Sequence, residues 1–177
     1  MHSTSHPPQQ TKVLVVFFDL TGFFKFSQKS TNVEIFKFLD EFYKLSGQII
    51  AAAGGKIVKF IGDAGLAFFP EELASQGVLT SRALKVKVEQ WLSNKNLKSK
   101  LVVKVHFGPV AAGMIGPATD KRFDIIGNTV NTAATLPSYG FSMTPQAFRK
   151  LDPAGRKLFK KHTPAVRYIP LEEDHRD

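Results

Sequence analysis

The sequence has no cysteine, and this absence excludes several kinds of chemistry at once. Disulfides, thiolate nucleophiles and zinc sites built on cysteine are ruled out, and the composition suits a reducing compartment. No apolar run reaches the roughly 18–20 residues that a membrane-spanning helix needs. The opening segment, Met1–Gln10, is polar and lacks the apolar stretch of a signal peptide. We therefore expect a cytoplasmic chain without a membrane span, although it can be a fragment of a longer regulated protein.

Acidic residues are also scarce relative to basic ones. The 24 Lys and Arg outnumber the 15 Asp and Glu, which gives a net charge of +9. Such an excess is compatible with nucleic acid, an anionic membrane surface or a polyphosphate as a partner. The basic residues are spread along the chain, and no recognition helix, zinc finger or mixed aromatic and basic motif is present. We therefore expect most of them to be solvated surface, and we expect no nucleic-acid partner.

The order of the secondary-structure signals predicts the fold. A buried strand at Lys12–Phe18 is followed by helical spacing over 33–53, a hairpin at 56–69, a helix from Pro70 and a strand at Leu101–Phe107. This order is typical of an α+β fold, a ferredoxin-like βαββαβ sandwich.

The remaining elements elaborate this sandwich at its C-terminal end. Gly108-Pro109 is expected to break the preceding strand, after which an extended run resumes. Strands are expected at 122–126, 141–143 and 166–169, with helices at 129–136 and 145–151. In this scheme residues 1–11 are a disordered tail, 12–170 the folded domain and 171–177 a polar tail.

Two acids stand where strands end. Asp63 follows Gly62 at the bend of the hairpin, and Asp19 ends the first buried strand. Each alone is an ordinary turn or strand-end residue. If the two strands are neighbours, both carboxylates project from one edge of the sheet and repel each other unless a cation neutralises them. Magnesium or manganese, hard ions that prefer oxygen ligands, would suit this pair.

The five residues directly after Asp19 form a turn into the start of a helix. They are Leu20, Thr21, Gly22, Phe23 and Phe24. Free backbone N–H groups at such a place, together with the helix dipole, bind phosphate. Metal-binding acids beside an anion-binding turn indicate two-metal phosphoryl or nucleotidyl transfer, with ordinary strand-end acids as the alternative.

Four segments in order carry a family resemblance. They are FFDLTGF (Phe17–Phe23), KFIGDA (Lys59–Ala64), HFGPVAAGMIG (His106–Gly116) and FDIIGNTVNTAA (Phe123–Ala134). Each is a weak signal alone, but together they resemble the catalytic domain of class III nucleotidyl cyclases, the adenylyl and guanylyl cyclase family. The resemblance spans nearly the whole of 12–170. It implies a ferredoxin-like core that works as a head-to-tail homodimer, with active sites at the interface.

The resemblance also implies residue roles. Asp19 and Asp63 match the acids that bind two divalent metal ions, Mg²⁺ or Mn²⁺, in each active site. One ion would lower the pKa of the ribose 3′-hydroxyl, and the other would hold the triphosphate and stabilise the leaving pyrophosphate. Lys59 and Asp124 match the base-reading pair of an ATP pocket, for which guanylyl cyclases tend to use glutamate and cysteine. The implied reaction is the conversion of ATP to cyclic AMP and pyrophosphate.

One catalytic position departs from the family pattern. Asn131 matches the asparagine that orients the ribose, and four residues later the family places an arginine that stabilises charge on the α-phosphate. Here that position is Thr135, which supplies neither a cation nor a forked donor. Removal of preorganised oxyanion donors costs on the order of 10²–10³ in rate. The helix is also short, because Pro137 follows.

These departures leave three hypotheses open. The first is a weak adenylate cyclase, the second an inactive cyclase-like module that binds nucleotide or only dimerises, and the third another metal-dependent nucleotidyl transferase. Lys160 and Lys161 are candidates for the family's triphosphate-binding lysine. Arg149, Arg156 and Arg167 are candidates to replace the arginine.

Overall fold

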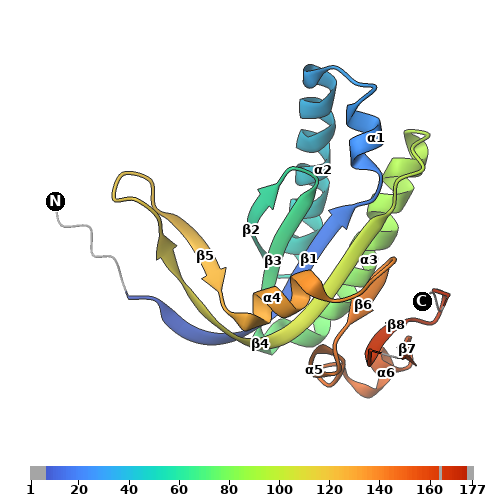
Figure 1. Cartoon of the computed structure of the whole chain (residues 1–177). Coiled ribbons are helices and arrows are strands. Elements are labelled where there is room, and N and C mark those ends of the chain that lie inside the picture. Colours follow the sequence, from blue (N-terminus) through green and yellow to red (C-terminus); the bar gives the residue numbers. More distant parts are fainter. Residues whose placement is uncertain (1–6, 164, 175–177) are drawn as a thin grey trace.

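The computed structural model describes residues 7–163 and 165–174. Within them one sheet has the strand order β2-β3-β1-β4-β6-β8-β7, and β5 pairs with β4 (Figure 1). The strands are β1 Gln9–Leu20, β2 Lys56–Ile61, β3 Ala64–Pro70, β4 Leu101–Ile115, β5 Arg122–Ile126, β6 Phe141–Met143, β7 Phe159–His162 and β8 Arg167–Pro170. The helices are α1 Phe23–Ser27, α2 Asn32–Ala52, η1 Glu71–Leu73, α3 Ala74–Asn94, α4 Asn128–Thr135, α5 Pro145–Phe148 and α6 Pro153–Arg156.

The two faces of the sheet carry different helices, as Figure 1 shows. Alternate residues of β1, Leu14, Val16 and Phe18, belong to the larger core, which also contains buried side chains of α2 and α3. The intervening Val13 and Val15 pack with Ala133 of α4 in a smaller cluster. We call the side of the sheet occupied by this smaller cluster the α4 face. The alternation follows from the two-residue period of a strand and confirms the predicted α+β sandwich.

Local chemistry fixes the ends of the long helix α2. The Thr31 side chain accepts a hydrogen bond from the Glu34 N–H at 3.3 Å, and the Glu34 carboxylate accepts from the Thr31 N–H at 2.7 Å. This capping box satisfies two N–H groups that the helix leaves unpaired. After the helix, Gly54 adopts φ +79°, a left-handed conformation that favours glycine and turns the chain toward β2.

The predicted N-terminal tail is partly wrong. Residues 9–11 belong to β1, where Gln9 pairs with Ala112 and Thr11 with Val110. Long-range pairing with β4 orders a segment whose own sequence carries no strand signal. Residues 1–6 of that tail, and 175–177 of the predicted polar tail, lie outside the described residues.

The break predicted at Gly108-Pro109 is also wrong, because β4 runs through both residues. On one side β4 pairs with β6 at residues 103–105 and with β5 at residues 111–115, so Pro109 stands in a gap of that ladder. Such a gap tolerates a residue without an N–H. The uninterrupted β4 carries the β4–β5 hairpin that projects from the domain in Figure 1.

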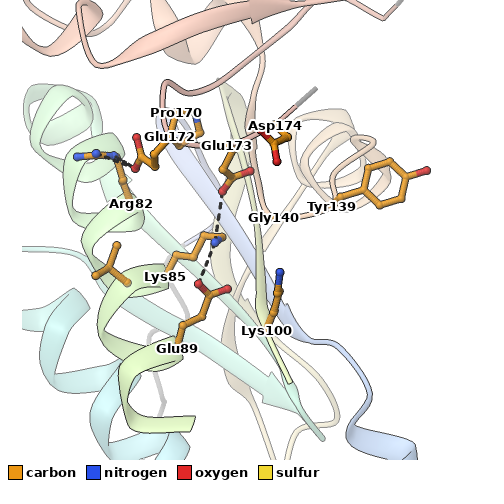
Figure 2. Close-up of a pocket in the computed structure, with 11 residues that line it drawn as sticks. Arg82, Lys85, Glu89, Lys100, Tyr139, Gly140, Pro170, Glu172, Glu173 and Asp174 are labelled. Atoms are coloured by element: carbon orange, nitrogen blue, oxygen red, sulfur yellow. Dashed lines mark hydrogen bonds and ion pairs between the residues drawn. The ribbon is translucent and has the colours of Figure 1, made fainter. Parts of the chain in front are cut away.

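The C-terminal elaboration differs from the prediction in detail. Helix α5 ends at Phe148, before the predicted Leu151, and the sequence missed both α6 and β7. Both missed elements have four residues, which is too short for a periodic signal. The segment after β8 folds back on α3, where Glu172 pairs with Arg82 at 2.7 Å and Glu173 with Lys85 at 3.3 Å (Figure 2). A cavity of about 330 Å³ lies between them.

Replacing Glu173 by alanine should destabilise the fold by about 1–2 kcal/mol. The Glu173 carboxylate accepts the Phe141 N–H at 2.9 Å and faces Lys85, so its loss leaves a part-buried donor and a cation without this partner. Glu172→Ala is the matched control, since its ion pair with Arg82 is more exposed and surface pairs contribute little. Thermal unfolding of both variants measures the difference; equal effects would contradict the role of Glu173.

Candidate active site

Asp19 and Asp63 lie together at one end of two adjacent strands. In the antiparallel pairing of β1 with β3, Asp19 is opposite Ala64, the residue directly after Asp63. The Leu20 N–H donates to the Asp63 carbonyl oxygen at 3.3 Å. Gly62 forms the turn with φ +58°. The predicted adjacency of the two strands is therefore confirmed, and it brings the two acids to one edge of the sheet.

The raised pKa of Asp19 and the repulsion between the two carboxyl groups fit a bound cation. Partial burial raises the pKa of Asp19 from 3.8 to about 6, and the charge of Asp63 and a hydrogen bond with its carboxyl add to the rise. The Leu20 N–H and the Lys104 ammonium oppose it without cancelling it. Two carboxyls in this state fit a hard divalent ion, which would relieve the repulsion.

The acids alone do not complete a metal coordination shell. Within residues 7–163 and 165–174, no cluster of three or more His, Cys, Asp or Glu side chains is placed to hold an ion. Mg²⁺ is commonly held by one or two carboxylates, with the remaining positions filled by water and by substrate phosphates. The donor set therefore fits a metal that is bound jointly with a nucleotide.

Helix α2 holds the turn that carries Asp63. The Tyr43 hydroxyl donates to the Gly62 carbonyl oxygen at 2.6 Å. The Tyr43 ring stacks on Phe60 of β2, with ring centroids 3.9 Å apart and planes within 7°. Sequence reasoning missed this function, because the helical spacing of Tyr43 indicated only a core position.

The segment after Asp19 lines a pocket beside the acids. Leu20, Gly22, Phe23 and Phe24 surround a space of about 480 Å³ together with Lys25, Ser27 and Asp63. Thr21 has a different role, since its N–H donates to the Lys100 carbonyl oxygen at 2.8 Å and its hydroxyl accepts the Lys100 N–H at 2.9 Å. Thr21 thus anchors the segment to the start of β4. Phosphate binding by the segment stays a prediction.

The predicted base-reading pair is in direct contact. Lys59 of β2 and Asp124 of β5 are 65 residues apart in sequence, and the Lys59 Nζ lies 2.5 Å from the Asp124 Oδ2. The other carboxylate oxygen of Asp124 accepts the Ile125 N–H at 2.8 Å. Lys59 is 43% exposed and Asp124 18%, so the pair is held in place and still reachable from solvent.

Asn131 and Thr135 share the exposed side of α4. The Thr135 hydroxyl donates to the Asn131 carbonyl oxygen at 2.8 Å, which is the contact of residues four apart on a helix. Thr135 is the last residue of α4, and Leu136 beyond it has left the helical conformation. The predicted register and the early end of this helix are both confirmed.

The candidate triphosphate-binding lysines and the candidate replacement arginines lie elsewhere in the chain. They belong to the C-terminal elaboration: Arg149 follows α5, Arg156 is in α6, Lys160 and Lys161 are in β7, and Arg167 is in β8. Strands β4, β6 and β8 separate β7 from β1. A cation that no sequence argument singled out, Lys104 of β4, lies closer to the acids, since its charge acts on Asp19.

Comparison with known proteins identifies this arrangement. A family model described as the adenylate and guanylate cyclase catalytic domain matches residues 6–151. The chain belongs to this cyclase family. A receptor-type guanylate cyclase of Drosophila melanogaster is 32% identical over 142 residues, which cover 76% of this chain and 9% of that protein. An adenylate cyclase of Anabaena cylindrica is 24% identical over 133 residues, covering 71% of this chain and 26% of that protein.

Solved cyclase structures share the fold of this cyclase domain. A bacterial light-regulated adenylyl cyclase superposes with a TM-score of 0.83 at 21% identity, covering 97% of this chain and 55% of that one. An adenylyl cyclase from P. aeruginosa gives a TM-score of 0.77 at 20% identity, covering 96% and 98%. The chain spans only 9% and 26% of the two curated relatives. In the part of the chain that is described, no helix is long and apolar enough to cross a bilayer.

Proposed function

We propose that this cyclase domain forms cyclic AMP and pyrophosphate from ATP, at the interface of a head-to-tail homodimer. The observation that carries the proposal is the ion pair between Lys59 and Asp124. Adenine presents an acceptor at N1 and a donor at N6, and a lysine beside a carboxylate offers the complementary donor and acceptor. Guanine presents the opposite pattern at these two positions, so the same pair disfavours GTP.

The relatives alone leave the base open, because they include both guanylate and adenylate cyclases. One structural neighbour is a rhodopsin-guanylyl cyclase core with converted specificity in complex with ATPalphaS, with a TM-score of 0.70. Its fold therefore accommodates either nucleotide. The choice of ATP for this chain rests on Lys59 and Asp124.

The remaining residues have complementary roles in the proposal. Asp19 and Asp63 would hold two Mg²⁺ or Mn²⁺ ions, which would supply Lewis-acid activation of the ribose hydroxyl and of the leaving pyrophosphate. Asn131 orients the ribose from the exposed side of α4. The segment 20–24 faces the triphosphate. Thr135 adds no charge, so we expect slow turnover.

Product analysis tests this function directly. Purified protein is incubated with ATP and Mn²⁺, and in parallel with GTP, and the cyclic product is separated by chromatography. More cyclic AMP formed from ATP than cyclic GMP formed from GTP supports the proposal. A preference for GTP, or linear products alone, would overturn it.

A paired substitution should exchange the base preference. Lys59→Glu combined with Asp124→Cys replaces the donor and acceptor by the pair that guanylyl cyclases tend to use, and it removes the ion pair. We expect the ratio of kcat/KM for ATP over GTP to fall by more than about 100-fold, since each mismatched buried polar contact costs roughly 1–3 kcal/mol. Steady-state kinetics with both nucleotides measure this ratio. Lys56→Glu, on the same strand, is the control, because Lys56 lies over the Phe123 ring and not beside Asp124.

A second candidate function is nucleotide binding without turnover. It is favoured by Thr135, whose hydroxyl bonds back to Asn131, and by the end of α4 at that residue. Calorimetric binding of Mn-ATP in the absence of any cyclic product would support this module over the enzyme.

A further inference from the structure

Lys104 projects from near the start of β4 toward the same side of the sheet as Asp19. Its neighbours Val103 and Val105 belong to the core under α2 and α3, so the strand period places Lys104 on the α4 face. In the β1–β4 pairing Lys104 is opposite Phe17, two residues from Asp19 along β1. Such diagonal neighbours are within reach of a long side chain.

The Lys104 ammonium is held in place within electrostatic reach of Asp19. Its Nζ donates to the Ala134 carbonyl oxygen at 2.8 Å, in the last turn of α4. Its charge attracts the Asp19 carboxylate. An ammonium group carries three donors, and Ala134 accepts one of them. The side chain is only partly exposed, in contrast to most lysines of this chain.

A capping role accounts for part of this arrangement, since a cation at the C-terminal end of a helix is favourable by itself. It does not account for the choice of a partly buried position whose charge acts on Asp19. Once two divalent ions balance these carboxylates, the triphosphate remains as a concentrated negative charge on this side of the sheet. The family pattern places a cation at position 135, and this chain has none there.

We propose that Lys104 binds the triphosphate of the nucleotide and supplies there the positive charge that Thr135 lacks. This inference rests on the proposed nucleotide chemistry of the same site. It makes Lys104 a catalytic residue in contact with the substrate, and it assigns a function to a strand position that sequence reasoning left as solvated surface.

The test separates charge from capping. Lys104→Gln removes the charge and keeps an N–H donor on a slightly shorter side chain, and Lys104→Arg keeps both the charge and a donor. Lys87→Gln makes the same change of charge on an exposed position of α3, on the opposite face of the sheet. Calorimetry with Mn-ATP, Mn-pyrophosphate and adenosine is combined with cyclase kinetics on each variant.

We expect Lys104→Gln to weaken the binding of Mn-ATP and of Mn-pyrophosphate about tenfold, because one charge-assisted contact is lost. Adenosine binding should be unchanged. Turnover of Lys104→Gln should fall by about 10²-fold. Lys104→Arg, which keeps the charge, should retain more affinity and turnover than Lys104→Gln, and Lys87→Gln should stay within a few-fold of the natural protein. Unchanged affinity for both phosphate ligands, with only a lower melting temperature, would overturn the inference and leave Lys104 as a helix cap.

The two proposals fail in different ways. If the natural protein makes no cyclic AMP but Lys104→Gln still weakens the binding of Mn-ATP, the cyclase function is wrong and the phosphate contact stands. If cyclic AMP forms equally well with Lys104→Gln, the cyclase stands and the inference about Lys104 fails. If the natural protein binds neither Mn-ATP nor Mn-pyrophosphate, both are wrong.

Discussion

Replacing Asp63 by asparagine should abolish metal-dependent turnover, with a loss of at least about 10³-fold, since metal stabilisation of developing charge is worth several kcal/mol. The same substitution should stabilise the metal-free protein. Asp19 and Asp63 repel each other across the end of β1 and β3, and asparagine removes the repulsion while it keeps the size of the side chain. We expect a gain of about 1 kcal/mol at neutral pH, because solvent screens this partly exposed pair.

The sign of the pH dependence follows from the raised pKa of Asp19. Between 3.8 and about 6 the folded protein binds more protons at Asp19 than the unfolded chain does. The free energy of unfolding of the metal-free protein therefore falls as the pH rises through this window, and it falls less in Asp63→Asn. Proton binding also competes with the metal, so metal affinity should weaken below about pH 6.

Thermal melts across this pH range, with and without Mn²⁺, measure the pH dependence of stability and the weakening of metal binding at low pH. Asp40→Asn, on the solvent side of α2 in an exposed pair with Lys44, is the control for the loss of a carboxylate. Metal-induced stabilisation of Asp63→Asn equal to that of the natural protein, or undiminished turnover, would show that the metal site lies elsewhere.

Replacing Thr135 by arginine should raise turnover, by about tenfold or more toward the 10²–10³ that preorganised donors contribute. The hydrogen bond from Thr135 to Asn131 fixes the helical register, so an arginine there occupies the same exposed side of α4 as Asn131, the residue proposed to orient the ribose. Because Thr135 is exposed, the larger side chain displaces no core group. Thr135→Gln is the control for size without charge, and kcat for cyclic AMP formation is the measurement.

The gain should depend on Lys104. If Lys104 already supplies positive charge to the triphosphate, Thr135→Arg gains more in a Lys104→Gln background than in the natural protein, and the two substitutions are non-additive. Equal gains in both backgrounds would mean that the two positions act independently. No gain in either, with α4 intact by circular dichroism, would contradict the role assigned to position 135.

Much of this protein was accessible from its sequence because the relevant signals are local. The apolar run before Asp19 and the Gly-Asp turn at Asp63 depend on strand period and turn chemistry, which neighbouring residues determine. The spacing from Asn131 to Thr135 similarly sets two side chains on one helix face. The resemblance to the cyclase family implies a cation at position 135, and the sequence has Thr135 there. No tertiary structure was needed to see that difference.

Only the tertiary structure decided which distant groups meet. The contact of Lys59 with Asp124 depends on how β2 lies against β5, and the pairing that orders Gln9–Thr11 depends on the length of β4. Lys104 looked like any surface lysine until strand pairing set it beside Asp19 and under the end of α4. A sequence fixes the period and chemistry of each segment, but the charges around a side chain come from segments far along the chain, and so only packing reveals them.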